Sequence, residues 1–233
     1  MPGMNFPYQI KRTGRRSRSI SVRVHGDGTV RVGAPDWVGL AEIRDVVAEH
    51  SAWIAERLSA VRAVQPQYVT GTKHPYLGRA YPLEVVNGNG RPAVQFGRAG
   101  FRVVVARRDP ARVRTELQRW YRERAQSLLG QRLERLTAKL PWVGSTAESR
   151  IKWRVRRMRT QWGSCCETGL ITLNTNLVKA PLKLIDYVIL HELAHLKHHD
   201  HGRRFQKLMD AHMSDWRERR RELNSLGERL LFD

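Results

Sequence analysis

The chain has 233 residues, enough for one large domain or for a catalytic domain with a smaller partner, and long enough to bury a core without disulfides. Hydrophobic residues make up 41% of it, which is typical of a folded protein and excludes a wholly disordered chain. The formal net charge of +20, from 42 basic and 22 acidic residues, attracts polyanions such as nucleic acid, nucleotides or an anionic surface. Because the arginines are spread along the whole chain, a simply solvated basic surface is an equally good interpretation.

The cysteine content and the absence of long apolar runs bear on the compartment. Cys165 and Cys166 are adjacent and offer no disulfide framework, so we expect a reducing environment, in which they are small buried residues. No signal-peptide-like run precedes residue 12, and no stretch reaches the roughly 18 apolar residues of a membrane span. We therefore expect a cytoplasmic protein without a membrane partner, and the oligomeric state stays open.

The first half of the sequence predicts strands interrupted by one long helix. Alternating apolar residues predict a β-hairpin over 20–32, with its turn at 25–28. Helical spacing of apolar residues predicts a helix from 37 to about 64, with Asp36 as its N-cap. Glycines then separate two short predicted strands, 81–86 and 101–105.

The second half predicts mainly helices. One helix opens at Pro110 and ends before Pro141. Strands are predicted at 151–160 and 170–173, then a largely buried helix from Pro181 and a last helix from about Arg203. This order predicts an α+β fold, with a β-rich N-terminal part over 1–106 that contains the long helix, and a helical domain over 107–233.

The buried helix carries the sequence His191-Glu192-Leu193-Ala194-His195. Residues four apart lie on one face of a helix, so the two imidazoles can bind one ion, while Glu192 reaches a water on that ion without ligating it. Two histidines and a glutamate would be costly in an apolar helix unless they had such a role. The pattern predicts a zinc hydrolase in which Glu192 activates a zinc-bound water.

A catalytic zinc needs a third protein ligand, and the candidates are His198, His199 and His201. In an unbroken helix His198 would lie about 10 Å along the axis from His191, too far to share one ion. The chain must therefore turn after Leu196, within the polar run 197–202. The spacing from His195 to His201 matches an extended zincin pattern, although His198 stands where that pattern has glycine, and it favours His201.

Three segments carry a family resemblance: Arg157–Cys165 (RMRTQWGSC), Leu173-Asn174 and Ile185–His201. They resemble the YgjP-like metal-dependent hydrolases, relatives of the SprT-like and other zincin-type metallopeptidases. Segments 19–32 and 76–79 extend the likeness over most of the chain, and Gln161 and Cys166 depart from the family's pattern. The resemblance implies a zincin-like C-terminal domain with one Zn²⁺ per chain.

The same resemblance implies that His191, His195 and His201 bind the zinc and that Glu192 is the catalytic acid/base. It implies a metallopeptidase, but a nucleotide pyrophosphatase activity on UTP is also attached to the family. Peptide and nucleotide therefore both stand as substrates.

Three further residues are candidates for substrate binding. Arg157 and Arg159 share the parity of the apolar face of the strand 151–160, so in a regular strand they would point inward and bind a phosphate or carboxylate. A bulge would turn them to water instead. Ser164 could donate a hydrogen bond in the site, or simply belong to a tight turn, and Asp186 could orient a ligand imidazole.

Three functions follow from these residues. The first is a zinc metallopeptidase whose substrate lies along the strand near 170–173. The second, motivated by the charge and by Arg157 and Arg159, is a zinc-dependent nucleotide hydrolase. The third, suggested by the SprT-like relatives, is a DNA-associated protease that binds nucleic acid through its basic surface and trims bound proteins.

Overall fold

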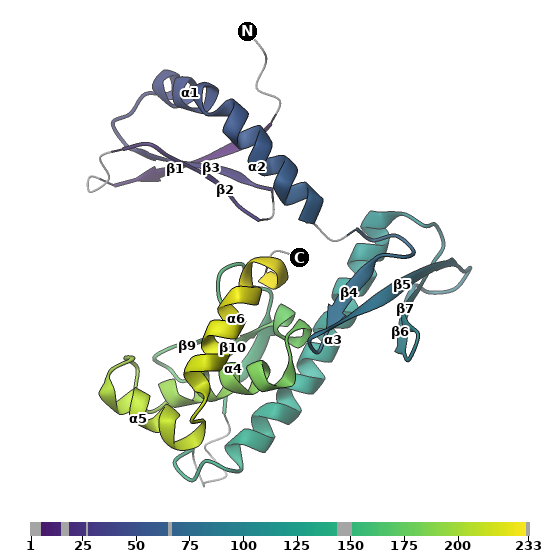
Figure 1. Ribbon diagram of the computed structural model, residues 1–233, viewed down its shortest axis with the longest axis vertical. Coiled ribbons are helices and arrows are strands. Elements are labelled where there is room, and N and C mark those ends of the chain that lie inside the picture. The colour runs from purple at the N-terminus through teal and green to yellow at the C-terminus, as the bar shows by residue number, and fades with distance from the viewer. Residues whose placement is uncertain (1–5, 15–18, 27, 65–66, 144–150, 232–233) are drawn as a thin grey trace. The chain divides into compact units, whose positions relative to one another are not determined.

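The computed structural model describes residues 6–14, 19–26, 28–64, 67–143 and 151–231. They form two compact units, which divide the chain at residues 65 and 66 (Figure 1). Within the described residues, no helix combines the length and the apolar character that crossing a bilayer requires.

The first unit is a three-stranded sheet with two helices on one face (Figure 1). Its elements are β1 (Tyr8–Thr13), β2 (Ser21–Val24), β3 (Val30–Pro35), α1 (Leu40–Glu49) and α2 (Ser51–Val64). The central strand β3 runs parallel to β1 and antiparallel to β2. Val30 and Val32 of β3 are buried in one cluster with Ile43, Val47 and Ile54 of the helices, which gives this unit a hydrophobic core of its own.

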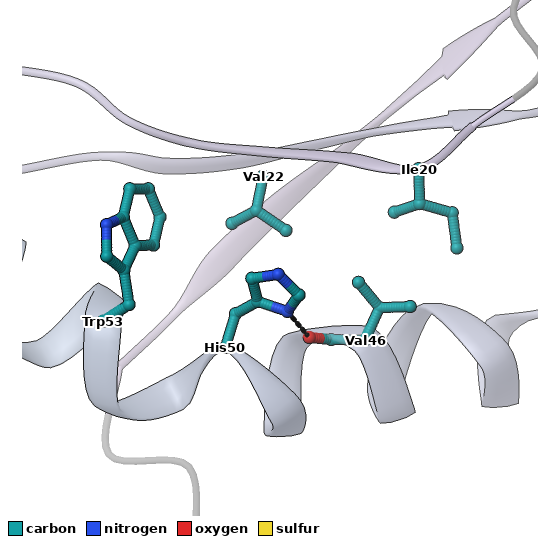
Figure 2. A pocket seen from close by; sticks show the side chains of 5 residues that line it. All are labelled: Ile20, Val22, Val46, His50 and Trp53. Atoms are coloured by element: carbon teal, nitrogen blue, oxygen red, sulfur yellow. Dashed lines mark hydrogen bonds between the residues drawn. The ribbon is translucent and has the colours of Figure 1, made fainter.

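The predicted hairpin over 20–32 is confirmed as the antiparallel pair β2–β3, although Asp27 of its turn lies outside the described residues. The single predicted helix from 37 to 64 is wrong in two respects. Its N-cap is Gly39 and not Asp36. The helix also breaks at His50, whose backbone N–H and Nδ1–H both donate to the carbonyl of Val46, at 3.1 and 2.9 Å (Figure 2).

The His50 ring also lines a hollow of about 330 Å³ between β2 and the junction of α1 and α2 (Figure 2). The other lining residues are Ile20, Val22, Val46 and Trp53. This hollow belongs to the first unit, whereas the histidine-rich motif lies in the second.

The second unit begins with a four-stranded sheet of order β4-β5-β7-β6 that packs on a long helix. Its elements are β4 (Lys73–Tyr76), β5 (Arg79–Asn87), β6 (Ala93–Gly97), β7 (Gly100–Val105) and α3 (Pro110–Thr137). Asp109 caps α3 by accepting from the backbone N–H of Ala111 at 3.1 Å, and Pro110 takes the first helical turn. The strands predicted at 81–86 and 101–105 and the helix predicted from 110 are confirmed.

A second small sheet and four helical segments complete this unit. They are β8 (Trp153–Arg156), β9 (Gly163–Cys165), β10 (Ile171–Asn174), the 3-10 helix η1 (Thr175–Lys179), α4 (Leu182–His195), α5 (Arg203–His212) and α6 (Trp216–Leu231). β10 is the central strand, parallel to β8 and antiparallel to β9. Helix α4 is the central helix, in contact with α3, α5 and α6 (Figure 1). The last predicted helix is in fact two, because α5 ends at His212 and Met213 is its extended C-cap.

The predicted α+β class, with strands dominating the N-terminal half and a buried helix carrying the motif, is confirmed. Buried side chains within residues 67–105 pack in the same hydrophobic core as the helices of the second unit. The predicted division of the chain into 1–106 and a catalytic domain over 107–233 stays a prediction.

Candidate metal centre

Helix α4 brings His191 and His195 together. No glycine or proline interrupts it, and nine of its fourteen residues are buried, so its burial in the core holds the helix rigidly. The two histidines are one turn apart on one face, and their ring centroids are 4.8 Å apart. Their Nε2 atoms approach to 3.2 Å.

The chain turns directly after α4, where the sequence predicted a turn. The backbone N–H groups of Lys197 and His198 both donate to the carbonyl of Ala194, at 3.1 and 2.9 Å, and the helix ends there. The following residues bring His201 back, so that its Nε2 lies 3.2 Å from Nε2 of His191. One ligand atom from each of the three imidazoles lies within 4.8 Å of the others.

The three nitrogens fit a tetrahedral metal ion. Zinc–nitrogen bonds of 2.0–2.1 Å at tetrahedral angles would place the nitrogens about 3.3 Å apart, close to the two separations of 3.2 Å. The Nδ1–H of His195 donates to the carbonyl of His198 at 3.0 Å, which leaves the lone pair of Nε2 directed at the cluster. The Nδ1 atom of His191 is buried without a partner among the described residues.

Electrostatics keep these rings in the form that binds metal. Burial, and then the neighbouring charges of His195 and His201, lower the pKa of His191 to about 3. Burial also lowers the pKa of His195. Both rings are therefore neutral near pH 7, and a neutral imidazole is the form that donates a lone pair to a metal.

Phe205, in the first turn of α5, supports all three rings. Its ring centroid lies 5.0, 4.8 and 4.9 Å from those of His191, His195 and His201, and only 1% of the residue is exposed. No role in the site was predicted for Phe205. No local pattern could have found this contact, because it depends on how α5 folds back on α4.

Glu192 is buried beside the histidines, with 5% of the residue exposed. Burial raises its pKa to about 8. Strand β9 closes over it at Gly163, where an added Cβ would lie 2.5 Å from Oε1 and 2.7 Å from Cγ of Glu192. The absence of a side chain at Gly163 is therefore what lets the strand approach the acid.

The loop that leads into β9 is fixed by Asn174, which is fully buried. Its side-chain amide donates to the carbonyls of Met158 and Gln161, at 2.8 and 2.7 Å. Its backbone N–H donates to the carbonyl of Trp162 at 2.9 Å. Asn174 thus holds the residues immediately before Gly163 in place.

Two further groups face the cluster and were not predicted. Tyr187 is one turn before His191, with ring centroids 5.8 Å apart. Arg220 lies four residues after the buried Trp216, on the face of α6 that packs on α4. Its positive charge lowers the pKa of His191. The same charge opposes the rise that burial causes in the pKa of Tyr187. Helical spacing from His191 could have identified Tyr187, but nothing local identifies Arg220.

The other candidates for substrate binding stay untested. Strand β8 ends at Arg156, and Met158 rather than Arg157 takes the next half-buried position, so the inward alternation does not continue. Arg157 and Arg159 are both exposed. Ser164 is half-buried in β9, and a role in binding substrate stays a prediction for all three residues.

Asp186 does not orient a ligand, contrary to one prediction, because it forms a two-point ion pair with Arg132 of α3, with Nε 2.7 Å from Oδ1. The predicted substrate strand is also wrong. Both edges of β10 are already paired, with β8 and β9, so an extended peptide has no free edge there.

The adjacent cysteines differ in their surroundings. Cys165 is half-buried, and burial together with the charge of Glu192 raises the pKa of its thiol to about 11. Cys166 is exposed, which contradicts the expectation that it is buried, and its Sγ lies 3.0 Å from Oγ1 of Thr168.

Comparison with known proteins identifies one family. The family model described as YgjP-like, metallopeptidase domain, matches residues 18–226. No curated protein matches the chain. Among solved structures, the crystal structure of the metallopeptidase zymogen of Pyrococcus abyssi abylysin is 22% identical, with a TM-score of 0.36, and the match covers 42% of this chain and 94% of that one.

Proposed function

The chain belongs to the YgjP-like family, a family of metallopeptidase domains, and from this premise we propose that it is a zinc-dependent peptidase with Glu192 as its general base. One observation carries the proposal. The Nε2 atoms of His195 and His201 each lie 3.2 Å from Nε2 of His191, a separation that fits tetrahedral zinc, beside a buried carboxylate.

The three imidazoles would hold one zinc ion and leave a fourth position open to substrate or water. When bound, zinc supplies a Lewis acid that polarises a peptide carbonyl and makes water more acidic. The donor set favours zinc over magnesium or calcium, because those ions prefer oxygen ligands and the cluster offers three nitrogens.

Glu192 moves the proton. Its carboxylate accepts a proton from the attacking water and returns it to the leaving amine. In the metal-free protein, burial raises the pKa of Glu192 to about 8, and the positive charge of a bound zinc would lower it toward neutral pH, where a general base is most effective. A carboxylate in bulk water would be a weaker base at the same pH.

Tyr187 and Arg220 complete the site. The pKa of the Tyr187 hydroxyl is raised by burial, so at neutral pH it keeps its proton and can donate a hydrogen bond to the carbonyl oxygen as negative charge develops. Arg220 forms no ion pair among the described residues and would bind a carboxylate of the substrate.

A peptide substrate would extend along the free edge of strand β9. β9 lies at the edge of its sheet, and its first residue, Gly163, contacts Glu192. Main-chain hydrogen bonds to such an edge would hold a substrate without demanding particular side chains. This arrangement favours peptide over nucleotide.

The test combines zinc content with peptide cleavage in the purified wild type and three variants. We expect about one zinc per chain in the wild type, a much lower content in His201→Ala, and an unchanged content in the control His199→Ala, whose side chain is exposed outside the cluster. Glu192→Gln should keep its zinc and lose peptide cleavage. Zinc unchanged in His201→Ala would overturn the ligand set, and UTP hydrolysis that is lost in Glu192→Gln while no peptide is cleaved would replace the peptidase with a nucleotide hydrolase.

A further inference from the structure

The sheet of the first unit has a face that helices α1 and α2 do not cover (Figure 1). Side chains alternate along a strand, so residues between buried positions point to the other side. Val30 and Val32 are buried under the helices, which places Arg31 on the uncovered face. The strand pairing sets Arg23 of β2 and Gln9 of β1 directly beside Arg31.

This uncovered surface, the outer sheet face, is basic. It includes Gln9, Lys11, Ser21, Arg23, Arg31 and Gly33. Gly33 contributes no side chain at its centre, and a Cβ there would lie 2.8 Å from Oγ of Ser21. No aspartate or glutamate occurs in any of the three strands.

The arginines on this face are arranged in a way that costs stability. Arg23 and Arg31 are directly opposite each other in an antiparallel pair, and like charges in that position destabilise a sheet. Among the described residues neither of them, nor Lys11, forms an ion pair. An external anion lying across the pair would relieve this repulsion.

The acidic residues of the unit lie on its helical side. Those that the structure describes are Asp36, Glu42, Asp45, Glu49 and Glu56, all in the helices or just before them. Among the described residues, the outer sheet face therefore carries cations and no anion, whereas the helical side carries both signs, since Arg44 and Arg57 lie there with the acids. A surface of one sign that is kept clear of the other attracts and orients a polyanion.

The composition of the outer sheet face indicates which polyanion fits. Proteins that bind single strands stack bases on aromatic side chains, and this face presents no aromatic residue among its described positions. Cations and small polar groups suit the phosphate backbone of a duplex, which requires no base to be unstacked. We propose that the outer sheet face docks on the phosphate backbone of double-stranded nucleic acid, without sequence preference and independently of the peptidase site.

The test measures how binding depends on salt. The full-length chain is titrated with a short, fluorescently labelled DNA duplex of random sequence between about 50 and 200 mM salt. Each neutralised phosphate contributes about −0.9 to the slope of log affinity against log salt, so the double variant Arg23→Gln, Arg31→Gln should reduce the slope by about 1.8. Wild-type affinity should then fall about 12-fold more than that of the variant across this range.

The matched control removes two charges from the other side of the same unit. Arg44 and Arg57 are exposed on α1 and α2, and the double variant Arg44→Gln, Arg57→Gln should keep the wild-type slope. Equal loss of slope in both double variants would overturn the proposal, because binding would then follow net charge alone. Tighter binding to a single strand of the same length would also overturn it. So would binding to phosphatidylserine-containing vesicles without binding to the duplex.

Folding is checked separately. Because the double variant at Arg23 and Arg31 removes a repulsive pair, its melting temperature should be no lower than that of the wild type. If that variant does not fold, Lys11→Gln serves in its place, with an expected loss of about 0.9 in slope. An unchanged slope in a folded Lys11→Gln protein would then contradict the proposal.

Discussion

Gly163→Ala is the most informative single change in the active site. The new Cβ would lie 2.5 Å from Oε1, 2.7 Å from Cγ and 2.8 Å from Cδ of Glu192, closer than real Cβ contacts come. Ordinary contact begins near 3.4 Å, so the carboxylate oxygen must move by roughly 0.9 Å, the difference between 3.4 and 2.5 Å. Misplacement of a reacting group by about 1 Å costs about 100-fold in rate.

We therefore expect kcat of Gly163→Ala on peptides to fall about 100-fold, within the 10²–10⁴-fold range that a general base contributes. Zinc content should be unchanged, because the alanine is placed against Glu192 and not against a histidine. Overpacking should also lower the free energy of unfolding by about 1–3 kcal/mol, measured in urea.

The control for this change is Gly97→Ala, where an added Cβ meets nothing within 4 Å and the backbone φ is ordinary. It should leave kcat and zinc content as they are. A folded Gly163→Ala protein with wild-type kcat would refute the assignment of Glu192 as the base that β9 holds in place. Loss of zinc together with activity would mean that the strand supports the histidines instead.

Three further predictions concern the same unit. In the metal-free protein the folded state keeps the Glu192 proton up to a pKa of about 8, whereas the unfolded state releases it near 4.5, so this group makes stability fall as pH rises between those values. The pKa of His191 is lowered from 6.5 in the unfolded state to about 3 in the folded state, so this group makes stability rise with pH between 3 and 6.5. The effects of Glu192 and His191 therefore oppose each other from pH 4.5 to 6.5, and from pH 6.5 to 8 only the loss of stability caused by Glu192 remains. Chemical denaturation should show this last fall in the wild type and not in Glu192→Gln, and the same fall in both would contradict the burial of the acid. Arg220→Gln should raise KM about 10- to 100-fold for peptides with a carboxylate near the cleaved bond and leave neutral peptides unchanged, while Arg221→Gln, next to it and exposed, should change neither. Asp186→Asn should cost about 2 kcal/mol of unfolding free energy, because it leaves a mostly buried arginine on α3 without its partner, and calorimetry should show this loss with zinc content intact.

Much of the arrangement around the motif could be predicted because it depends on local rules. The spacing of His191 and His195 sets them on one face of a helix whatever surrounds it. The rise per residue showed that no third histidine could reach the ion from an unbroken helix, which required a turn after Leu196, and the structure has that turn. His201 could be preferred on spacing alone, since only a few residues separate it from the helix.

The contacts that complete the site could not be predicted in this way. Gly163 meets Glu192, Phe205 supports the imidazoles and Arg220 faces them, yet each pair is brought together by the packing of separate elements. Periodicity also continues across the breaks at His50 and after His212, so it predicted unbroken helices there. For Arg157 the sequence left an inward and an outward position open, and the residue is exposed because alternation stops when the strand ends.

The position of Gly163 links the geometry of the site to its chemistry. Burial raises the pKa of this carboxyl group, and Gly163 of β9 lies directly against it. A side chain at residue 163 would force the carboxylate or β9 to move, and water admitted by that movement would lower the pKa of Glu192 toward 4.5. Asn174 secures the same approach from the other end, by fixing the carbonyls of Gln161 and Trp162 just before the glycine. The residues that set the strength of the base are therefore the ones that set the path of β9, and a substitution at Asn174 should lower the pH at which activity rises without touching any residue that contacts the substrate.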